Sequence, residues 1–142
     1  MRFWDSSALV TLVCEEARSP ACRRLLRTDR SVAVWALTRT EMVSAVRRKQ
    51  RLDGLTLREV SLANRAIGLL AEHWHEIDAI GPVRDRAERL LAVHDLRAAD
   101  ALQLGAALTL FDDRPRRRSL VTLDEALAEV AEAEGFEVTV PA

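Results

Sequence analysis

The sequence predicts an α/β fold with three layers, in which a mostly parallel central sheet is covered by helices on both faces. Short segments rich in apolar, β-branched and aromatic residues alternate along the chain with longer segments of helical periodicity. The short segments carry too few polar residues for one face to be exposed, which is typical of buried parallel strands. With 142 residues, 49% of them hydrophobic, the chain is long enough for one such core, so residues 1–142 are interpreted as a single domain.

Helix and strand signals in the first half of the chain place two strands among four helices. Ser19 followed by Pro20 is typical of an N-cap with proline at the first helical position. Gly54 ends one helix, and Thr56 with Glu59 has capping-box spacing at the start of the next. The expected elements are a strand at 2–5, helices at 6–16 and 19–27, a strand at 31–35, and helices at 38–52 and 56–73.

The second half is expected to add three strands and three helices. The segment 98–111 is rich in alanine and leucine on every side, which indicates a helix buried in the core. Gly135 is interpreted as the glycine that ends the last helix, before an alternating strand. The expected elements are a strand at 75–80, a helix at 81–94, a helix at 98–111, a loop at 112–118, a strand at 119–122, a helix at 124–134 and a strand at 136–140.

Three of four candidate functional acids stand where a strand gives way to a helix. Asp5 and Asp124 each end an apolar strand segment, and ligands bind at this edge of open α/β sheets. Either residue could simply cap the following helix, although Ser6 and Ser7 could cap the first one and leave the Asp5 carboxylate free. Glu41 lies in the first turn after a strand, and its spacing from Thr38 also fits a structural capping box.

Asp100 is the fourth candidate, because it lies in the helix that is expected to be buried. An ionised carboxylate without partners is costly there. The helix dipole or a pair with Arg97 could account for it, but a metal ion explains it better. Four carboxylates in one crevice repel one another unless a cation is present, and Mg²⁺ or Mn²⁺ suits such oxygen ligands. The chemistry predicted is metal-assisted hydrolysis of a phosphodiester.

Other features of the sequence exclude several classes. A formal charge of −1 gives no overall field to attract nucleic acid, so RNA contacts must come from local basic runs. Two cysteines fit neither a zinc site nor a disulfide scaffold, isolated glycines disfavour a phosphate loop, and no apolar run approaches the ~20 residues of a membrane span. A soluble cytoplasmic protein is expected. A basic run is usually a solvated surface, but two runs, 47–51 and 114–118, are candidates for phosphate contacts. The candidate residues are Arg47, Arg48, Arg116 and Arg117.

The chain resembles the PIN-domain family, and within it the VapC-type toxins of bacterial toxin–antitoxin pairs. The resemblance rests on four strings in the same order across nearly the whole chain: DSSAL at 5–9, TRTEM at 38–42, LRAADAL at 96–102 and LVTLD at 120–124. It implies a PIN fold and a Mg²⁺-dependent endoribonuclease that attacks tRNA or ribosomal RNA. It also implies a homodimer, a cognate antitoxin that masks the site, and an acidic cluster at Asp5, Glu41, Asp100 and Asp124 with Ser6 and Thr122 beside it.

Three alternatives stay open at the level of sequence. The chain could be a PIN nuclease that is not a toxin, or a catalytically inactive PIN-like module that binds protein or RNA and keeps the acids as helix caps. Intact acids at all four positions argue against the inactive module. A phosphatase of the haloacid dehalogenase type would require a second aspartate two residues after the first, where this chain has Ser7.

Overall fold

The central sheet has five strands, and every neighbouring pair is parallel. A computed structural model describes all 142 residues and has the strand order β3-β2-β1-β4-β5. The sheet expected to be mostly parallel is therefore parallel throughout. The strands are β1 (Arg2–Trp4), β2 (Val32–Trp35), β3 (His75–Ile77), β4 (Ser119–Val121) and β5 (Glu137–Thr139).

The order of the strands creates a crevice beside β1. The chain passes from β1 outward to β2 and β3, and then returns to the other side of β1 for β4 and β5. Connections therefore leave the carboxyl ends of β1 and β4 in opposite directions, which is the place where open α/β sheets bind ligands. Phe3 pairs with Ala33 on one side and with Leu120 on the other, so the strands end at about the same level.

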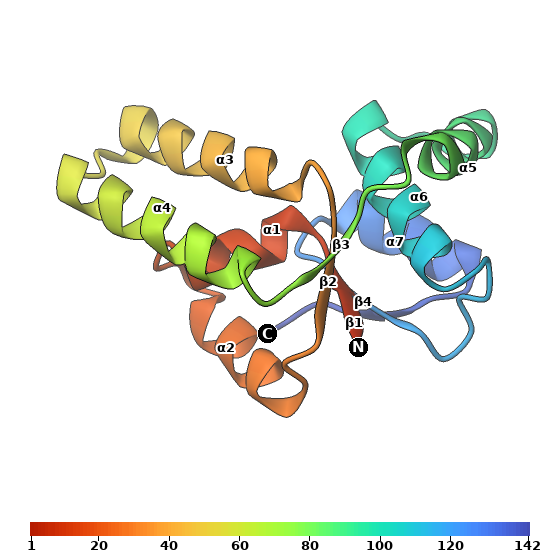
Figure 1. Cartoon of the computed structure of the whole chain (residues 1–142), viewed down its shortest axis with the longest axis horizontal. Coiled ribbons are helices and arrows are strands. Elements are labelled where there is room, and N and C mark those ends of the chain that lie inside the picture. Colours follow the sequence, from red (N-terminus) through yellow and green to blue (C-terminus); the bar gives the residue numbers. More distant parts are fainter.

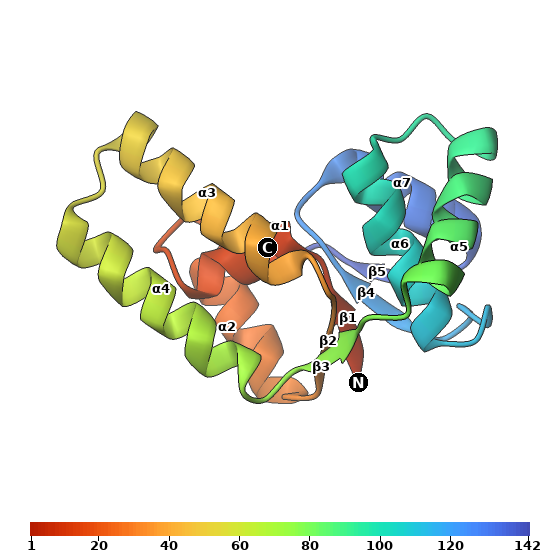
Figure 2. The same ribbon diagram turned by 45° about the horizontal axis from the view of Figure 1, so that its top comes forward.

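Helices cover both faces of the sheet, as Figures 1 and 2 show. Consecutive strand residues point to opposite faces, so Phe3 and Trp4 belong to two separate clusters of buried residues. The cluster around Trp4 packs against the helices on one side, and the cluster around Phe3 against those on the other. The first group is α1 (Ser6–Leu9), α2 (Ser19–Thr28), α3 (Thr38–Asp53) and α4 (Leu57–Ala71), and the second is α5 (Ile80–Val93), α6 (Ala98–Leu110) and α7 (Glu125–Glu134). None of these helices is long and apolar enough to cross a bilayer.

The first helix is shorter than the sequence indicates. The apolar pattern predicts an end near Glu16, but α1 gives way to a 3-10 turn, η1 (Val10–Leu12). The reason lies in Ser19, which is the first residue of α2 and not its N-cap. Its hydroxyl donates to the Thr11 carbonyl at 2.6 Å and accepts from the Glu16 amide at 2.8 Å. The hydroxyl thus occupies the Glu16 amide, whose single hydrogen a continued first helix would need.

Of the two capping boxes that the sequence suggests, one is present and one is not. The capping box of Thr56 and Glu59 is present at the start of α4. Thr38, by contrast, does not cap α3, because it is the first helical residue and its side chain is buried. The strand β3 ends at Ile77, before its expected end at residue 80, because Ile80 already begins α5.

Replacing Gly105 by alanine is expected to destabilise the fold by about 1–3 kcal/mol. Gly105 lies in α6 where this helix meets α5, and a Cβ atom there would lie 2.8 Å from the Val83 carbonyl oxygen and 3.2 Å from the Ala87 nitrogen. Gly68→Ala in α4 is the matched control, since the nearest atom to its Cβ is an Arg39 nitrogen at 4.0 Å. The control should gain about 0.5–1 kcal/mol. Urea unfolding measures both, and changes of the same sign would contradict the close contact.

Candidate functional site

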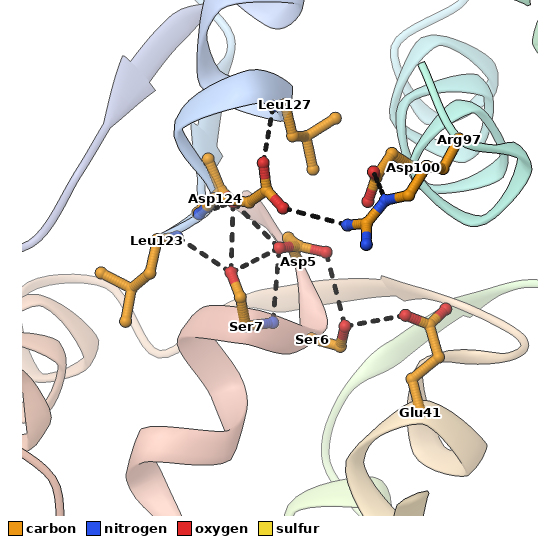
Figure 3. Close-up of polar contacts among 10 residues, drawn as sticks. Asp5, Ser6, Ser7, Glu41, Arg97, Asp100, Leu123, Asp124 and Leu127 are labelled. Carbon is orange, nitrogen blue, oxygen red and sulfur yellow. Dashed lines mark hydrogen bonds and ion pairs between the residues drawn. The ribbon is translucent and has the colours of Figure 1, made fainter. Parts of the chain in front are cut away.

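The four candidate acids all line one cleft at the carboxyl edge of the sheet. The cleft has a volume of about 840 Å³ and lies where the strand order reverses. Its acids come from four different elements: Asp5 follows β1, Glu41 lies in the first turn of α3, Asp100 in the first turn of α6, and Asp124 precedes α7. Figure 3 shows the four side chains around the cleft. The structure therefore brings together residues that lie up to 119 positions apart in the sequence (124 − 5).

Asp5 is almost fully buried, with 4% of its surface exposed. Its Oδ2 accepts hydrogen bonds from the Ser7 hydroxyl at 2.5 Å, the Thr122 hydroxyl at 2.9 Å and the Ser7 amide at 3.3 Å. Burial raises the pKa of Asp5, the bonds from Ser7 and Thr122 oppose the rise, and the charge of Asp100 adds to it. Asp5 is also the N-cap of α1. The possibility that the serines cap this helix in its place is wrong, but capping leaves the carboxylate at the cleft.

Glu41 is held at both carboxylate oxygens. Ser6 donates its hydroxyl to Oε2 at 2.9 Å, and Gln103 donates its amide to Oε1 at 3.1 Å. The same Ser6 hydroxyl lies 3.5 Å from Asp5 Oδ1, so it joins the two acids. Burial raises the pKa of Glu41, the bond from Ser6 opposes this, and the charges of Asp5 and Asp100 add to the rise. The carboxylate turns toward the cleft and leaves the predicted capping box with Thr38 unformed.

Arg97 bridges the other two acids. Its Nε lies 3.1 Å from Asp100 Oδ2, and one of its terminal nitrogens lies 3.4 Å from Asp124 Oδ2. The bond with Asp100 and the charges of both acids raise the pKa of Arg97. Asp124 also caps α7, because its Oδ1 accepts from the Leu127 amide at 2.9 Å. The pair that sequence reasoning offered as an alternative for Asp100 is present, yet the Arg97 side chain is 78% exposed at the mouth of the cleft.

The carboxylate oxygens of the four acids are the kind of ligand that binds a divalent cation, although the side chains do not converge on one point. No group of three or more acidic, histidine or cysteine side chains is placed to hold a metal ion, since Ser6 joins one pair of acids and Arg97 the other. The chemistry still suits Mg²⁺ or Mn²⁺, which prefer carboxylate oxygens. Burial and neighbouring charge disfavour the ionised forms of Asp5 and Glu41, and a cation relieves that cost. Arg97 supplies a positive charge beside Asp100 and Asp124.

The residues predicted to contact substrate are placed in different regions. Ser6 lines the cleft, and the buried Thr122 lies behind Asp5. Arg48 also lines the cleft, whereas Arg47 is exposed and donates to Gln50 at 3.1 Å. The loop with Arg116 and Arg117 leads into the amino end of β4 and therefore lies at the opposite edge of the sheet. RNA contact by these two arginines stays a prediction, and it concerns a surface away from the cleft.

Sequence reasoning missed Gln103 and gave Ser7 no role in the cluster. Gln103 is fully buried and contacts Glu41 from α6, while Ser7 bonds to Asp5. A signal for Gln103 was present: it lies one turn after Asp100 in an otherwise apolar segment, and residues three apart share a helix face. The bond of Ser7 to Asp5 is local, whereas its bonds to Thr122 and Leu123 depend on how α1 meets the segment after β4.

Comparisons with known proteins agree with this architecture. Residues 2–134 match the family model described as PIN domain. The chain is 33% identical over 139 residues to Ribonuclease VapC46 of Mycobacterium tuberculosis, covering 98% of this chain and 96% of that protein. Similar solved structures include a toxin–antitoxin complex from Klebsiella pneumoniae, with a TM-score of 0.69 at 15% identity over 100% of this chain and 98% of the other. FitAcB from Neisseria gonorrhoeae has a TM-score of 0.67 at 16% identity, over 99% and 98%. The two structures share the fold.

Proposed function

The chain belongs to the PIN-domain family and is similar to its VapC-type members, and from this we propose that it is a metal-dependent endoribonuclease that acts as the toxin of a toxin–antitoxin pair. We further propose that residues 1–142 form one PIN domain and that the bonds hydrolysed are phosphodiesters of tRNA or ribosomal RNA. The observation that carries the proposal is the single cleft lined by Asp5, Glu41, Asp100 and Asp124. The similarity to a VapC ribonuclease supports the activity, and the toxin–antitoxin complex among the structures that share the fold supports an antitoxin partner.

The four acids of the site fall into two pairs, one held by hydrogen bonds and one paired with an exposed arginine. Asp5 and Glu41 are held by neighbouring hydroxyls and an amide, which fix the orientation of both carboxylates at the cleft. Asp100 and Asp124 instead share Arg97, whose exposed side chain can leave them and face the RNA backbone. When bound, Mg²⁺ or Mn²⁺ supplies an activated water and neutralises charge on the attacked phosphate.

The lining of the cleft indicates how RNA is recognised. Arg48 extends from the same helix as Glu41 and has no ion pair, so its guanidinium is free for a phosphate. The neighbouring Lys49 also faces the cleft but is paired with Glu16. No aromatic side chain lines the cleft, so bases find no stacking platform there. These features support recognition of the backbone of a single strand.

A cognate antitoxin and a second copy of the chain complete the proposal. Apolar side chains on α4 and α5 are exposed in the isolated chain and give a partner surface to cover. They include Leu62, Leu69, Leu91 and Val93. Family resemblance, and not these side chains alone, supports the homodimer.

Removal of divalent metal is expected to abolish cleavage of single-stranded RNA by the purified protein, and excess Mg²⁺ or Mn²⁺ should restore it. Gel analysis of an end-labelled RNA with Mg²⁺, with EDTA and after metal is added back measures this. Cleavage that EDTA leaves unchanged would contradict the metal role, and RNA binding without cleavage under every condition would favour the inactive module.

The toxin role is tested in growing cells. Expression of the protein should arrest growth, and the product of a neighbouring reading frame should relieve the arrest. Normal growth on expression of an active nuclease would contradict the toxin role.

A further inference from the structure

Gln103 is a buried amide in a helix that otherwise buries alanine, leucine and glycine. Only 1% of its surface is exposed, and it lies one helical turn after Asp100 on the same face of α6. Its Nε2 donates to Glu41 Oε1 at 3.1 Å and to Thr38 Oγ1 at 3.2 Å. A polar side chain at this depth requires partners, and both partners of this one lie on α3.

The hydrogen bonds of Gln103 join helices that pack on opposite faces of the sheet. Met42 and Val46 of α3 belong to the buried cluster around Trp4, whereas Leu104 of α6 belongs to the cluster around Phe3. The amide therefore ties the helix that carries Glu41 to the helix that carries Asp100. It does so beside the cleft, where the relative position of these two acids matters.

Glu41 has a long side chain that needs such support. A glutamate has three rotatable bonds, and an unsupported carboxylate would sample many positions. Ser6 fixes one of its oxygens and Gln103 fixes the other, so neither is free to turn away. Partners behind a metal ligand typically set its orientation in this way.

We propose that Gln103 is a positioning residue, whose amide holds the Glu41 carboxylate in the orientation that binds the divalent ion. This rests on the proposed function, because it assigns Glu41 to the metal. Gln103 does not reach the ion or the RNA, and it acts only through Glu41 and Thr38. A purely structural role would predict changes in stability without changes in metal affinity.

Gln103→Met is expected to weaken binding of Mn²⁺ about tenfold, the usual effect of removing a partner of a metal ligand. The variant keeps an unbranched side chain of similar length but has no donor for Glu41. Calorimetric titration of the full chain with MnCl₂, without RNA, gives the affinities, and thermal melting gives the stability of each variant.

Thr109→Val is the matched control, because it removes another polar side chain of α6, one that bonds to the Gly105 carbonyl at 2.8 Å far from the cleft. It should leave Mn²⁺ affinity unchanged. Thr38→Val provides a second variant if Gln103→Met does not fold, and it should weaken Mn²⁺ binding in the same direction. Wild-type affinity in every folded variant would overturn the positioning role alone, whereas a wild-type protein that binds no Mn²⁺ would overturn the metal assignment as well.

Discussion

Asp100→Asn is expected to slow RNA cleavage about a thousandfold, a loss of ~4 kcal/mol of transition-state stabilisation. Asparagine has nearly the same shape as aspartate but no charge for a divalent ion. The fold should be retained, because asparagine has nearly the same shape and loses only the ion pair with Arg97, whose side chain is 78% exposed, and pairs with exposed partners contribute little to stability. Initial rates of cleavage with saturating Mg²⁺ measure the effect.

Asp112→Asn is the control for this variant. The same substitution is made here outside the cleft, because Asp112 lies in the loop after α6. Its positive φ of 52° is one that asparagine tolerates well. The control should cleave RNA at the wild-type rate. Should Asp100→Asn cleave as fast as the control, the assignment of Asp100 to the metal would be wrong.

Asp5→Asn is expected to move stability and metal binding in opposite directions. Without metal the variant should be more stable than wild type by about 1 kcal/mol, or ~4 °C in Tm, because it removes a buried carboxylate whose charged form is disfavoured. Asparagine caps helices as well as aspartate does, so α1 should be kept. With Mn²⁺ at a hundred times its Kd, wild type should gain about 2.7 kcal/mol while the variant gains none. Melting curves with and without Mn²⁺ measure both effects.

The extra stability of Asp5→Asn over wild type, measured without metal, should depend on pH. Burial raises the pKa of Asp5, so the folded protein binds this proton more tightly than the unfolded chain does. The contribution of Asp5 to stability is therefore complete below the ordinary aspartate value of 3.8 and is lost as the pH rises through the raised pKa. Asparagine does not titrate, so the difference in unfolding free energy between variant and wild type should grow with pH.

Asp124→Asn is the control for the metal-free comparison. Asp124 also follows a strand and caps a helix, but its side chain is 26% exposed and paired with Arg97. Its replacement should give no stabilisation. Equal gains from Asp5→Asn and Asp124→Asn would show that burial is not the cause.

The sequence predicts the sheet and the four acids because both depend on signals that are local. Buried strands are short apolar segments, and the acids stand directly after them or in the first turns of helices. Parallel strands end at one edge, so sequence order alone brings Asp5 and Asp124 together. The same topology places the loop of Arg116 and Arg117 at the other edge, which sequence reasoning could have derived from its position before a strand.

Side chains that act across elements could not be predicted. Ser19 ends the first helix by bonding to Thr11, eight residues earlier, and nothing at either position indicates that bond. Thr38 and Glu41 fit a capping box by spacing, but tertiary contacts with Gln103 and Ser6 prevail over the local motif. Such contacts depend on how helices from different parts of the chain pack together.

The two clusters of buried residues support different acids of the cleft. Glu41 extends from a helix packed on one face of the sheet, and Asp100 and Asp124 extend from helices packed on the other face. Asp5 follows the strand β1, which lies between these two layers. The spacing of the acids therefore depends on how both layers of helices pack on the shared sheet, so a core substitution in either cluster is expected to alter the cleft without contacting it.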